Sequence, residues 1–156
     1  MPQIALVAVL ALTACSPSIE DQAVEVREMV EALLKAFDER DFATAHTMLS
    51  AADRVRHPRD RYVARHTGAT DLLRGAKLSH TIDYVELTGD RAHVVATYEL
   101  PAELMRRIRV LGGASPFLPA EDTTLEREFD LVREDDGWRV VLSERERTME
   151  ESVRRR

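Results

Sequence analysis

The sequence lacks features on which disulfide-bonded, zinc-binding and nucleic-acid-binding proteins depend. It contains a single cysteine, so an internal disulfide is impossible, and no spacing of Cys and His residues resembles a zinc site. Basic residues are fewer than acidic ones, 22 against 28, which argues against a general nucleic-acid-binding protein because such a protein needs a basic face. The 156 residues, 44% of them hydrophobic, are nevertheless enough for one domain with its own core.

The one cysteine stands in a specific context near the N-terminus. Every residue from Ile4 to Leu12 is apolar, a run too short to cross a bilayer as a helix but suited to the apolar core of an export signal. It ends in Leu12-Thr13-Ala14-Cys15, which resembles the bacterial lipoprotein box of an aliphatic residue, two small residues and Cys. The resemblance implies cleavage after Ala14, a diacylglycerol thioether on Cys15 and acylation of the new amino terminus.

From this resemblance we expect residues 1–14 to be a lipoprotein signal peptide and residues 15–20 to be a tether. The mature protein would then be exported and lipid-anchored to the bacterial cell envelope, because several acyl chains hold a protein firmly where one chain binds reversibly. Ser16, rather than an acidic residue, follows Cys15, which by analogy with enteric bacteria favours the outer membrane facing the periplasm over the inner membrane. Two other interpretations stay open: an inert buried thiol, or an ordinary secretory signal.

The first half of the mature chain has the spacing of amphipathic helices. Apolar residues recur every three or four positions in Ile19–Asp41, which predicts one helix with Ser18 as its N-cap. Asp41 is expected to cap a second helix, Ser50 opens a capping-box pattern, and a further short helix can start near Pro58. The residues expected to face inward are Ile19, Ala23, Val26, Val30, Leu33, Leu34 and Phe37, then Phe42, Ala45 and Leu49; the last helix carries Tyr62, Val63 and His66.

After Gly75 the period of the pattern becomes that of β-strands. Residues 78–100 predict a hairpin around a Gly89-Asp90 turn, and residues 123–142 predict a second hairpin that turns near Asp136-Gly137. In each hairpin the alternating apolar side chains share one face. The residues expected on that face are Val85, Leu87, Ala92 and Val94 in the first hairpin, and Leu125, Phe129, Leu131, Trp138, Val140 and Leu142 in the second.

Helices followed by antiparallel strands predict an α+β fold, with N-terminal helices packed on one face of a curved antiparallel sheet. In this respect the chain resembles the nuclear-transport-factor-2-like superfamily, the cystatin-like α+β cone. Residues 30–50, 89–100 and 135–144 carry the resemblance. We therefore expect such a domain over residues 21–145, followed by a charged C-terminal tail over residues 146–156.

The resemblance does not select a chemistry, because this superfamily includes isomerases, dehydratases, polyketide cyclases and non-catalytic modules. Its enzymes place an Asp, His or Tyr in a pocket between the sheet and the helices. By strand parity, Asp83, Tyr98 and Arg127 are expected to lean into such a pocket, which makes them the candidate catalytic residues. A structural Asp–Arg pair explains them equally well, and a one-residue bulge would turn Asp83 towards solvent.

The histidines do not form a pattern that indicates a metal. In the simplest register of the first hairpin, His80 faces Glu99 and His93 faces Glu86, which separates the two rings by about 20 Å. We expect no metal site and no cofactor. The other three histidines are His46, His57 and His66.

The stretch from Pro101 to Asp122, between the hairpins, is too apolar for a plain loop. A basic amphipathic helix here would suit a contact with anionic lipid or with a partner protein. A lid or a strand extension is the other interpretation. The apolar face would contain Leu104, Met105, Ile108 and Leu111, and the basic residues are Arg106, Arg107 and Arg109.

These features predict an exported binding or accessory domain of the cell envelope, attached to the membrane through Cys15. It would hold a small apolar ligand or support a partner protein. A lyase or isomerase of the same fold, acting on a hydrophobic substrate through Asp83 or Tyr98, is the alternative. A filled or wide apolar pocket with paired charges favours binding, whereas a carboxylate, a hydroxyl and an apolar wall that converge in an open pocket favour an enzyme.

Overall fold

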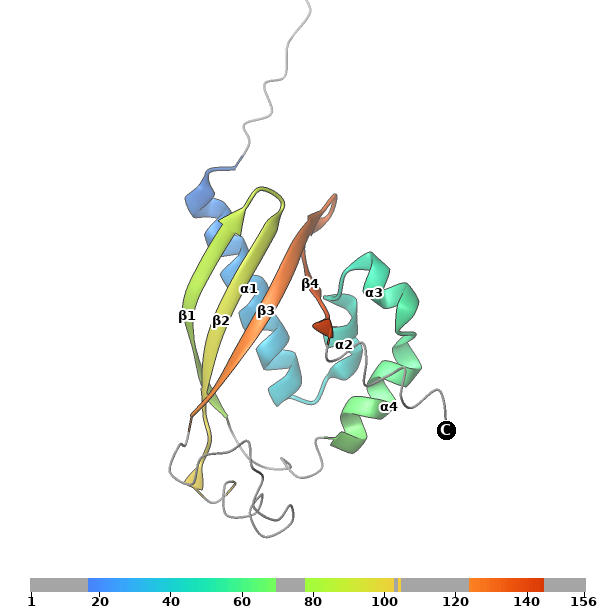
Figure 1. Ribbon diagram of the computed structural model, residues 1–156. Helices are drawn as coiled ribbons and strands as arrows, with labels where there is room; N and C mark the ends of the chain where they lie inside the picture. Colours follow the sequence, from blue (N-terminus) through green and yellow to red (C-terminus); the bar gives the residue numbers. More distant parts are fainter. Residues whose placement is uncertain (1–16, 70–77, 103, 105–123, 145–156) are drawn as a thin grey trace, which may run out of the picture.

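The computed structural model describes residues 17–69, 78–102, 104 and 124–144. The elements within these ranges are α1 (Ile19–Asp38), α2 (Phe42–Thr47), α3 (Ala51–Arg56), α4 (Arg59–Ala69), β1 (Ser79–Thr88), β2 (Arg91–Glu99), β3 (Thr124–Glu134) and β4 (Gly137–Val141). The strands form one antiparallel sheet in the order β1-β2-β3-β4. α1 runs behind this sheet in Figure 1, and the short helices lie beside β4. The expected α+β fold class is confirmed.

α1 is stabilised by a capping box and by one apolar stripe. The Ser18 hydroxyl oxygen accepts a hydrogen bond from the Asp21 amide at 3.1 Å, and the Asp21 carboxylate accepts one from the Ser18 amide at 3.2 Å. Val26, Val30 and Leu34 follow one another at intervals of four and are at most 1% exposed. This row packs α1 onto the sheet. No helix in the described ranges is both long and apolar enough to cross a membrane.

α1 ends earlier than the sequence predicts. Arg40 has a φ of 60°, in the left-handed region, so the helix cannot continue to Asp41. Asp41 instead caps α2, as predicted, and its Oδ1 accepts a hydrogen bond from the Thr44 amide at 3.0 Å. At the other end Ile19 is 74% exposed, so its expected place in the apolar stripe is wrong. It occupies the first turn of α1, which lies outside the contact with the core.

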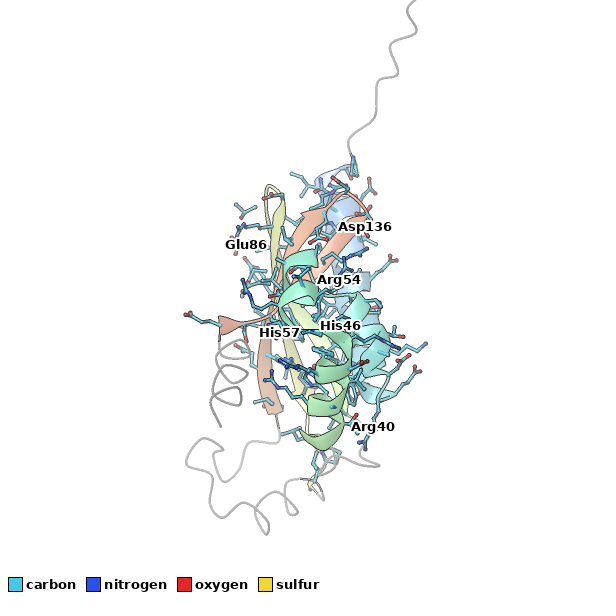
Figure 2. All side chains as sticks on the ribbon, turned by 90° about the vertical axis from the view of Figure 1, so that its right-hand side faces the viewer. Arg40, His46, Arg54, His57, Glu86 and Asp136 are labelled. Carbon is cyan, nitrogen blue, oxygen red and sulfur yellow. The ribbon has the colours of Figure 1, made fainter. Side chains whose placement is uncertain are left out.

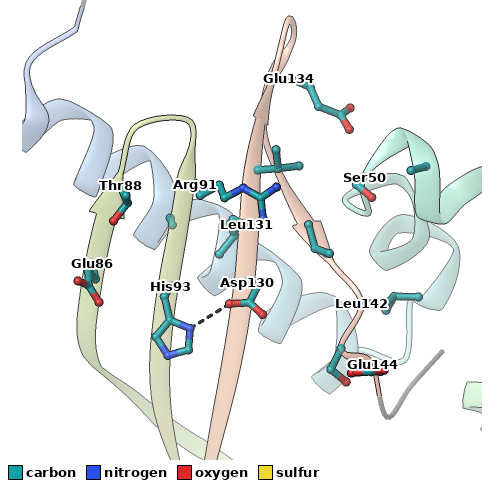
Figure 3. Close-up of a pocket in the computed structure, with 15 residues that line it drawn as sticks. Ser50, Glu86, Thr88, Arg91, His93, Asp130, Leu131, Glu134, Leu142 and Glu144 are labelled. Atoms are coloured by element: carbon teal, nitrogen blue, oxygen red, sulfur yellow. Dashed lines mark hydrogen bonds and ion pairs between the residues drawn. The ribbon is translucent and has the colours of Figure 1, made fainter. Parts of the chain in front are cut away.

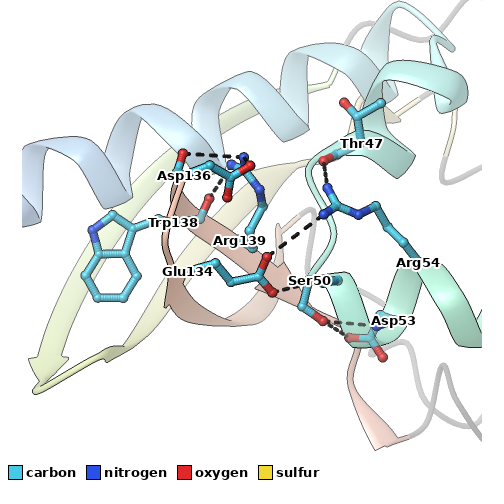
Figure 4. Close-up of polar contacts among 9 residues, drawn as sticks. Thr47, Ser50, Asp53, Arg54, Glu134, Asp136, Trp138 and Arg139 are labelled. Carbon is cyan, nitrogen blue, oxygen red and sulfur yellow. Dashed lines mark hydrogen bonds and ion pairs between the residues drawn. The ribbon is translucent and has the colours of Figure 1, made fainter.

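A buried carboxylate joins the short helices to the end of β4. The Ser50 amide donates to the Val140 carbonyl at 2.8 Å, and the Val140 amide donates to the Met48 carbonyl at 2.9 Å. Asp53 is 0% exposed, and its Oδ2 accepts from the Ser50 hydroxyl at 2.9 Å (Figure 4). The same oxygen accepts from the Leu142 amide at 3.0 Å. Ser50 caps α3 as predicted, but Asp53 does not close a capping box; its carboxylate holds a strand end 89 residues away.

The two turns lie at or next to their predicted places, and the pairs Val85–Val94 and Leu87–Ala92 agree with the sequence. The first hairpin turns at Gly89-Asp90, and the second turns at Asp135-Asp136, one residue before the predicted place. Leu125 was expected on the buried face but is 46% exposed, because it lies near the start of β3 beyond the packed core. The core between α1 and the sheet consists mainly of Val26, Val30, Leu33, Leu34, Ala92, Val94, Ala96, Phe129, Leu131, Trp138, Val140 and Leu142.

We expect Leu34→Ala to lower the free energy of unfolding by about 2–5 kcal/mol, because Leu34 is 1% exposed and the truncation leaves a cavity. Ile19→Ala, in the same helix, is the matched control and should change it by less than about 0.5 kcal/mol. Chemical denaturation followed by circular dichroism measures both. Equal losses for the two variants would contradict the placement of α1.

Candidate functional site

Two of the three polar residues that the sequence singled out meet on the inner face of the sheet. Tyr98, near the end of β2, is 9% exposed, and Arg127 on β3 is half-buried and pairs with Ala96. The Arg127 guanidinium donates a hydrogen bond to the Tyr98 hydroxyl oxygen. The expected inward orientation of both side chains is therefore confirmed.

The guanidinium of Arg127 lies between two aromatic rings. Its central carbon is 5.6 Å from the ring centroid of Phe37, in the last turn of α1, and 5.0 Å from that of Phe129 on β3. These cation–π contacts hold the charged group in place before any ligand arrives. Arg127 also borders a cavity of about 70 Å³, whose walls include Phe37, Tyr62 and Leu142. Ligand pockets for drug-sized molecules are usually about 300–1,000 Å³, so this cavity admits only part of a ligand.

Asp83 does not join this pair, and the expectation that it faces the interior is wrong. Ile82 pairs with Ala96 but Tyr84 pairs with Val95, so Asp83 is an extra residue in β1. This is the one-residue bulge that the sequence left open. The bulge turns Asp83 to the exposed outer face of the sheet and keeps Ile82 in the core.

Two side chains satisfy the polar groups at the bulge. The Thr97 hydroxyl donates to Oδ2 of Asp83 at 2.7 Å on the outer face. On the inner side Arg27, from α1, donates to the Ile82 carbonyl at 3.1 Å. A bulge interrupts the regular ladder of backbone hydrogen bonds, so a side-chain donor at this carbonyl stabilises it.

Asp38 and His80 complete the group, although the sequence identified neither as a site residue. The bulge places His80 opposite Tyr98, with ring centroids 6.2 Å apart, and not opposite Glu99 as expected. Asp38 interacts electrostatically with both His80 and Tyr98. We call Asp38, His80, Tyr98 and Arg127 the polar cluster. It lies at the end of the sheet away from the β1–β2 turn, where α1 ends.

One feature of the sequence could have identified Asp38 as a site residue. It stands four residues after Leu34, at the end of the row formed by Val26, Val30 and Leu34, although it is itself exposed. Its charge suggested the solvent face of the helix instead. No comparable signal exists for His80, because its direction depends on the bulge.

The electrostatics of the polar cluster follow from partial burial. Burial raises the pKa of Tyr98 above the ordinary 10.0, and Arg127 acts in the opposite direction. Burial also raises the pKa of Asp38 above 3.8; His80 lowers it and Glu39 raises it further. At neutral pH the Tyr98 hydroxyl is therefore a neutral donor beside a fixed cation. The cluster can bind a hydrogen-bond acceptor, and it contains groups that can hold or release a proton.

Three histidines outside the polar cluster contact other groups of the protein. No group of three or more His, Cys, Asp or Glu side chains in the described ranges is placed to hold a metal ion. His46 and His57 are buried close together beside the short helices, with Nε2 of His46 2.8 Å from the carbonyl oxygen of His57 (Figure 2). His93 pairs with Glu86, as predicted, and its Nδ1 lies 3.0 Å from Oδ1 of Asp130.

A larger groove lies on the opposite, outer face of the sheet, away from the polar cluster (Figure 3). Its volume is about 750 Å³. The strands contribute Glu86, Arg91 and Asp130, and Ser50 and Glu144 come from the segments beside β4. No pattern in the sequence indicates this groove, because none of these residues forms a motif.

Two groups of residues that the sequence predicts to be functional lie outside the described ranges. These are Cys15, expected to be lipidated, and the basic residues Arg106, Arg107 and Arg109, expected to contact a membrane or a partner. Both assignments stay predictions.

No protein-family model matches the sequence, and no curated protein matches it. Solved structures with a similar fold include a Campylobacter jejuni protein described as an NTF2-like transpeptidase, at 12% identity and a TM-score of 0.48, over 76% of this chain and 98% of that one. A protein from Streptomyces avermitilis described as an NTF2-like dehydratase matches at 15% identity and a TM-score of 0.48, over 79% of this chain and 93% of that one. The Kfla4162 protein from Kribbella flavida matches at 21% identity and a TM-score of 0.44, over 79% of this chain and 88% of that one. These likenesses concern the fold alone, and the named activities are those of the other proteins.

The raised pKa of Tyr98 predicts a pH effect on stability. Because the unfolded chain ionises this tyrosine first, near its ordinary pKa of 10.0, wild-type stability should fall as pH rises from there towards the higher folded pKa. Tyr98→Phe should lose less stability between about pH 9 and 11. Urea denaturation across this range measures both slopes. Equal slopes would contradict the burial of the hydroxyl.

Proposed function

We propose that this protein is an exported, lipid-anchored binding domain of the bacterial cell envelope. Its polar cluster binds a small amphipathic ligand whose head group accepts hydrogen bonds. The observation that carries this proposal is the position of Arg127, which is held between two aromatic rings, contacts the Tyr98 hydroxyl and borders a small cavity with both apolar and polar walls. Donors fixed before the ligand arrives lower the entropic cost of binding.

The rest of the interior supports binding at this end of the domain. The volume between α1 and the sheet is filled by buried apolar side chains, and the cavity beside Arg127 is about 70 Å³. A ligand would therefore contact the polar cluster and place only a short apolar group inside. The expectation of an apolar ligand is thus narrowed to an amphipathic one.

The proposed anchor suits this arrangement. α1 begins at Ile19, four residues after Cys15, so an anchor there keeps the first turn of α1 close to the lipid. A helix of 20 residues is about 30 Å long, and Asp38 is its last residue. The polar cluster would then face away from the membrane, open to molecules in the surrounding compartment.

The anchor is tested by metabolic labelling. Bacteria that express the full chain with labelled palmitate should incorporate the label, and Cys15→Ala should abolish it because the thioether and the new acylated terminus are lost. Ser16→Ala, in the adjacent position, is the control and should keep the label. Labelling of the Cys15→Ala variant would refute the assignment.

The binding site is tested by native mass spectrometry of the full chain, purified from bacterial membranes. Wild-type protein should carry a non-covalent small molecule that Tyr98→Phe/Arg127→Met loses. Arg133→Met is the matched control, because Arg133 also faces inward and lies 5.9 Å from an aromatic ring, that of Trp138. This variant should keep the ligand. Wild-type protein without a bound mass, or equal loss in both variants, would contradict the proposal.

A lyase or isomerase of the same fold is the second candidate, and one observation favours it. Asp38, an exposed carboxylate whose pKa burial raises, interacts electrostatically with both the Tyr98 hydroxyl and His80. Asp83, the leading candidate from the sequence, is exposed and cannot serve there. An enzyme would release an altered molecule, whereas a binding domain releases the ligand unchanged on denaturation.

A further inference from the structure

The outer face of the sheet is uncovered by any described helix, because α1 packs on the inner face (Figure 1). Its side chains form rows of like charge. On β3 the alternate residues Glu126, Glu128 and Asp130 all point outward and are exposed. β1 adds Asp83 and Glu86 on the same face.

Much of this negative charge is not neutralised within the domain. Asp130 is paired with His93, at 3.0 Å, but the described residues provide no ion-pair or hydrogen-bond partner for the side chains of Glu86, Glu126 and Glu128. Across the sheet, Glu128 is paired with Val95, a neutral neighbour. The row therefore keeps a field that attracts a cation.

Apolar side chains lie among these carboxylates. Tyr84 is 50% exposed and stands beside Val95, which in turn is beside Glu128. Towards β4 the groove of about 750 Å³ is lined by Val132 and Val141. An aromatic and aliphatic centre with a charged rim is the usual composition of a protein-binding surface.

We propose that this outer face docks an extended segment of another protein that carries Arg or Lys at alternate positions. Alternate residues of a strand are about 6.6–6.8 Å apart, so a basic segment of this pattern matches the spacing of Glu126, Glu128 and Asp130. A second copy of the chain would bring the same acidic rows together, and anionic lipid would also be repelled. The inference does not depend on the lipid anchor or on the ligand of the polar cluster.

The test uses fluorescence anisotropy with two labelled octapeptides, one alternating Arg and Thr and the other alternating Glu and Thr, against the full chain in a non-ionic detergent. The Arg peptide should bind, more weakly as salt is raised, and the Glu peptide should not. Glu126→Gln/Glu128→Gln should weaken binding about five-fold. Glu28→Gln/Glu31→Gln removes the same charge from the exposed side of α1 and should leave binding within about two-fold of wild type.

Three results would overturn the proposal. If both double variants weakened binding of the Arg peptide equally, the peptide would be attracted by the net charge of the protein and not by this face. A sedimentation coefficient that changes in Glu126→Gln/Glu128→Gln but not in the α1 variant would assign the face to a second copy. Tighter peptide binding after Arg154→Gln/Arg155→Gln/Arg156→Gln would mean that the arginines of the chain itself compete for the face.

Discussion

One extra residue in β1 decides which polar side chains meet on the inner face of the sheet. With the bulge at Asp83, His80 and Ile82 face inward; without it they would face outward and Asp83 would take their side. The bulge is stabilised from the opposite layer, since Arg27 of α1 donates to the Ile82 carbonyl at 3.1 Å. The composition of the polar cluster therefore depends on a contact between α1 and β1.

In the described domain, the core that stabilises the fold and the candidate binding surfaces lie in different regions. Apolar side chains fill the space between α1 and the sheet and stabilise the fold, whereas polar groups that range from exposed Asp38 to buried Tyr98 gather where α1 ends. Buried polar groups cost free energy unless they are paired, and here Arg127 is paired with Tyr98 and two aromatic rings. The outer face of the sheet contributes little to the core, so its acidic rows are free to serve an interaction.

Local patterns in the sequence predicted most of the fold. The caps at Ser18, Asp41 and Ser50 and the turn at Gly89-Asp90 depend on neighbouring residues, and all are present. The site was less predictable because it depends on contacts between distant residues: Arg27 with Ile82 across 55 positions. The same holds for Asp53, whose carboxylate reaches the Leu142 amide. Parity alone placed Tyr98 and Arg127 correctly, since no bulge interrupts the pairing of β2 with β3.

The pairing of His80 tests this account most directly, because the bulge determines the polar cluster. Cross-strand nuclear Overhauser effects in isotopically labelled protein identify the residue opposite His80. We expect backbone contacts between His80 and Tyr98, together with a contact between their rings. Contacts between His80 and Glu99, with Asp83 opposite Ala96, would show a regular strand without the bulge and would contradict the site described above.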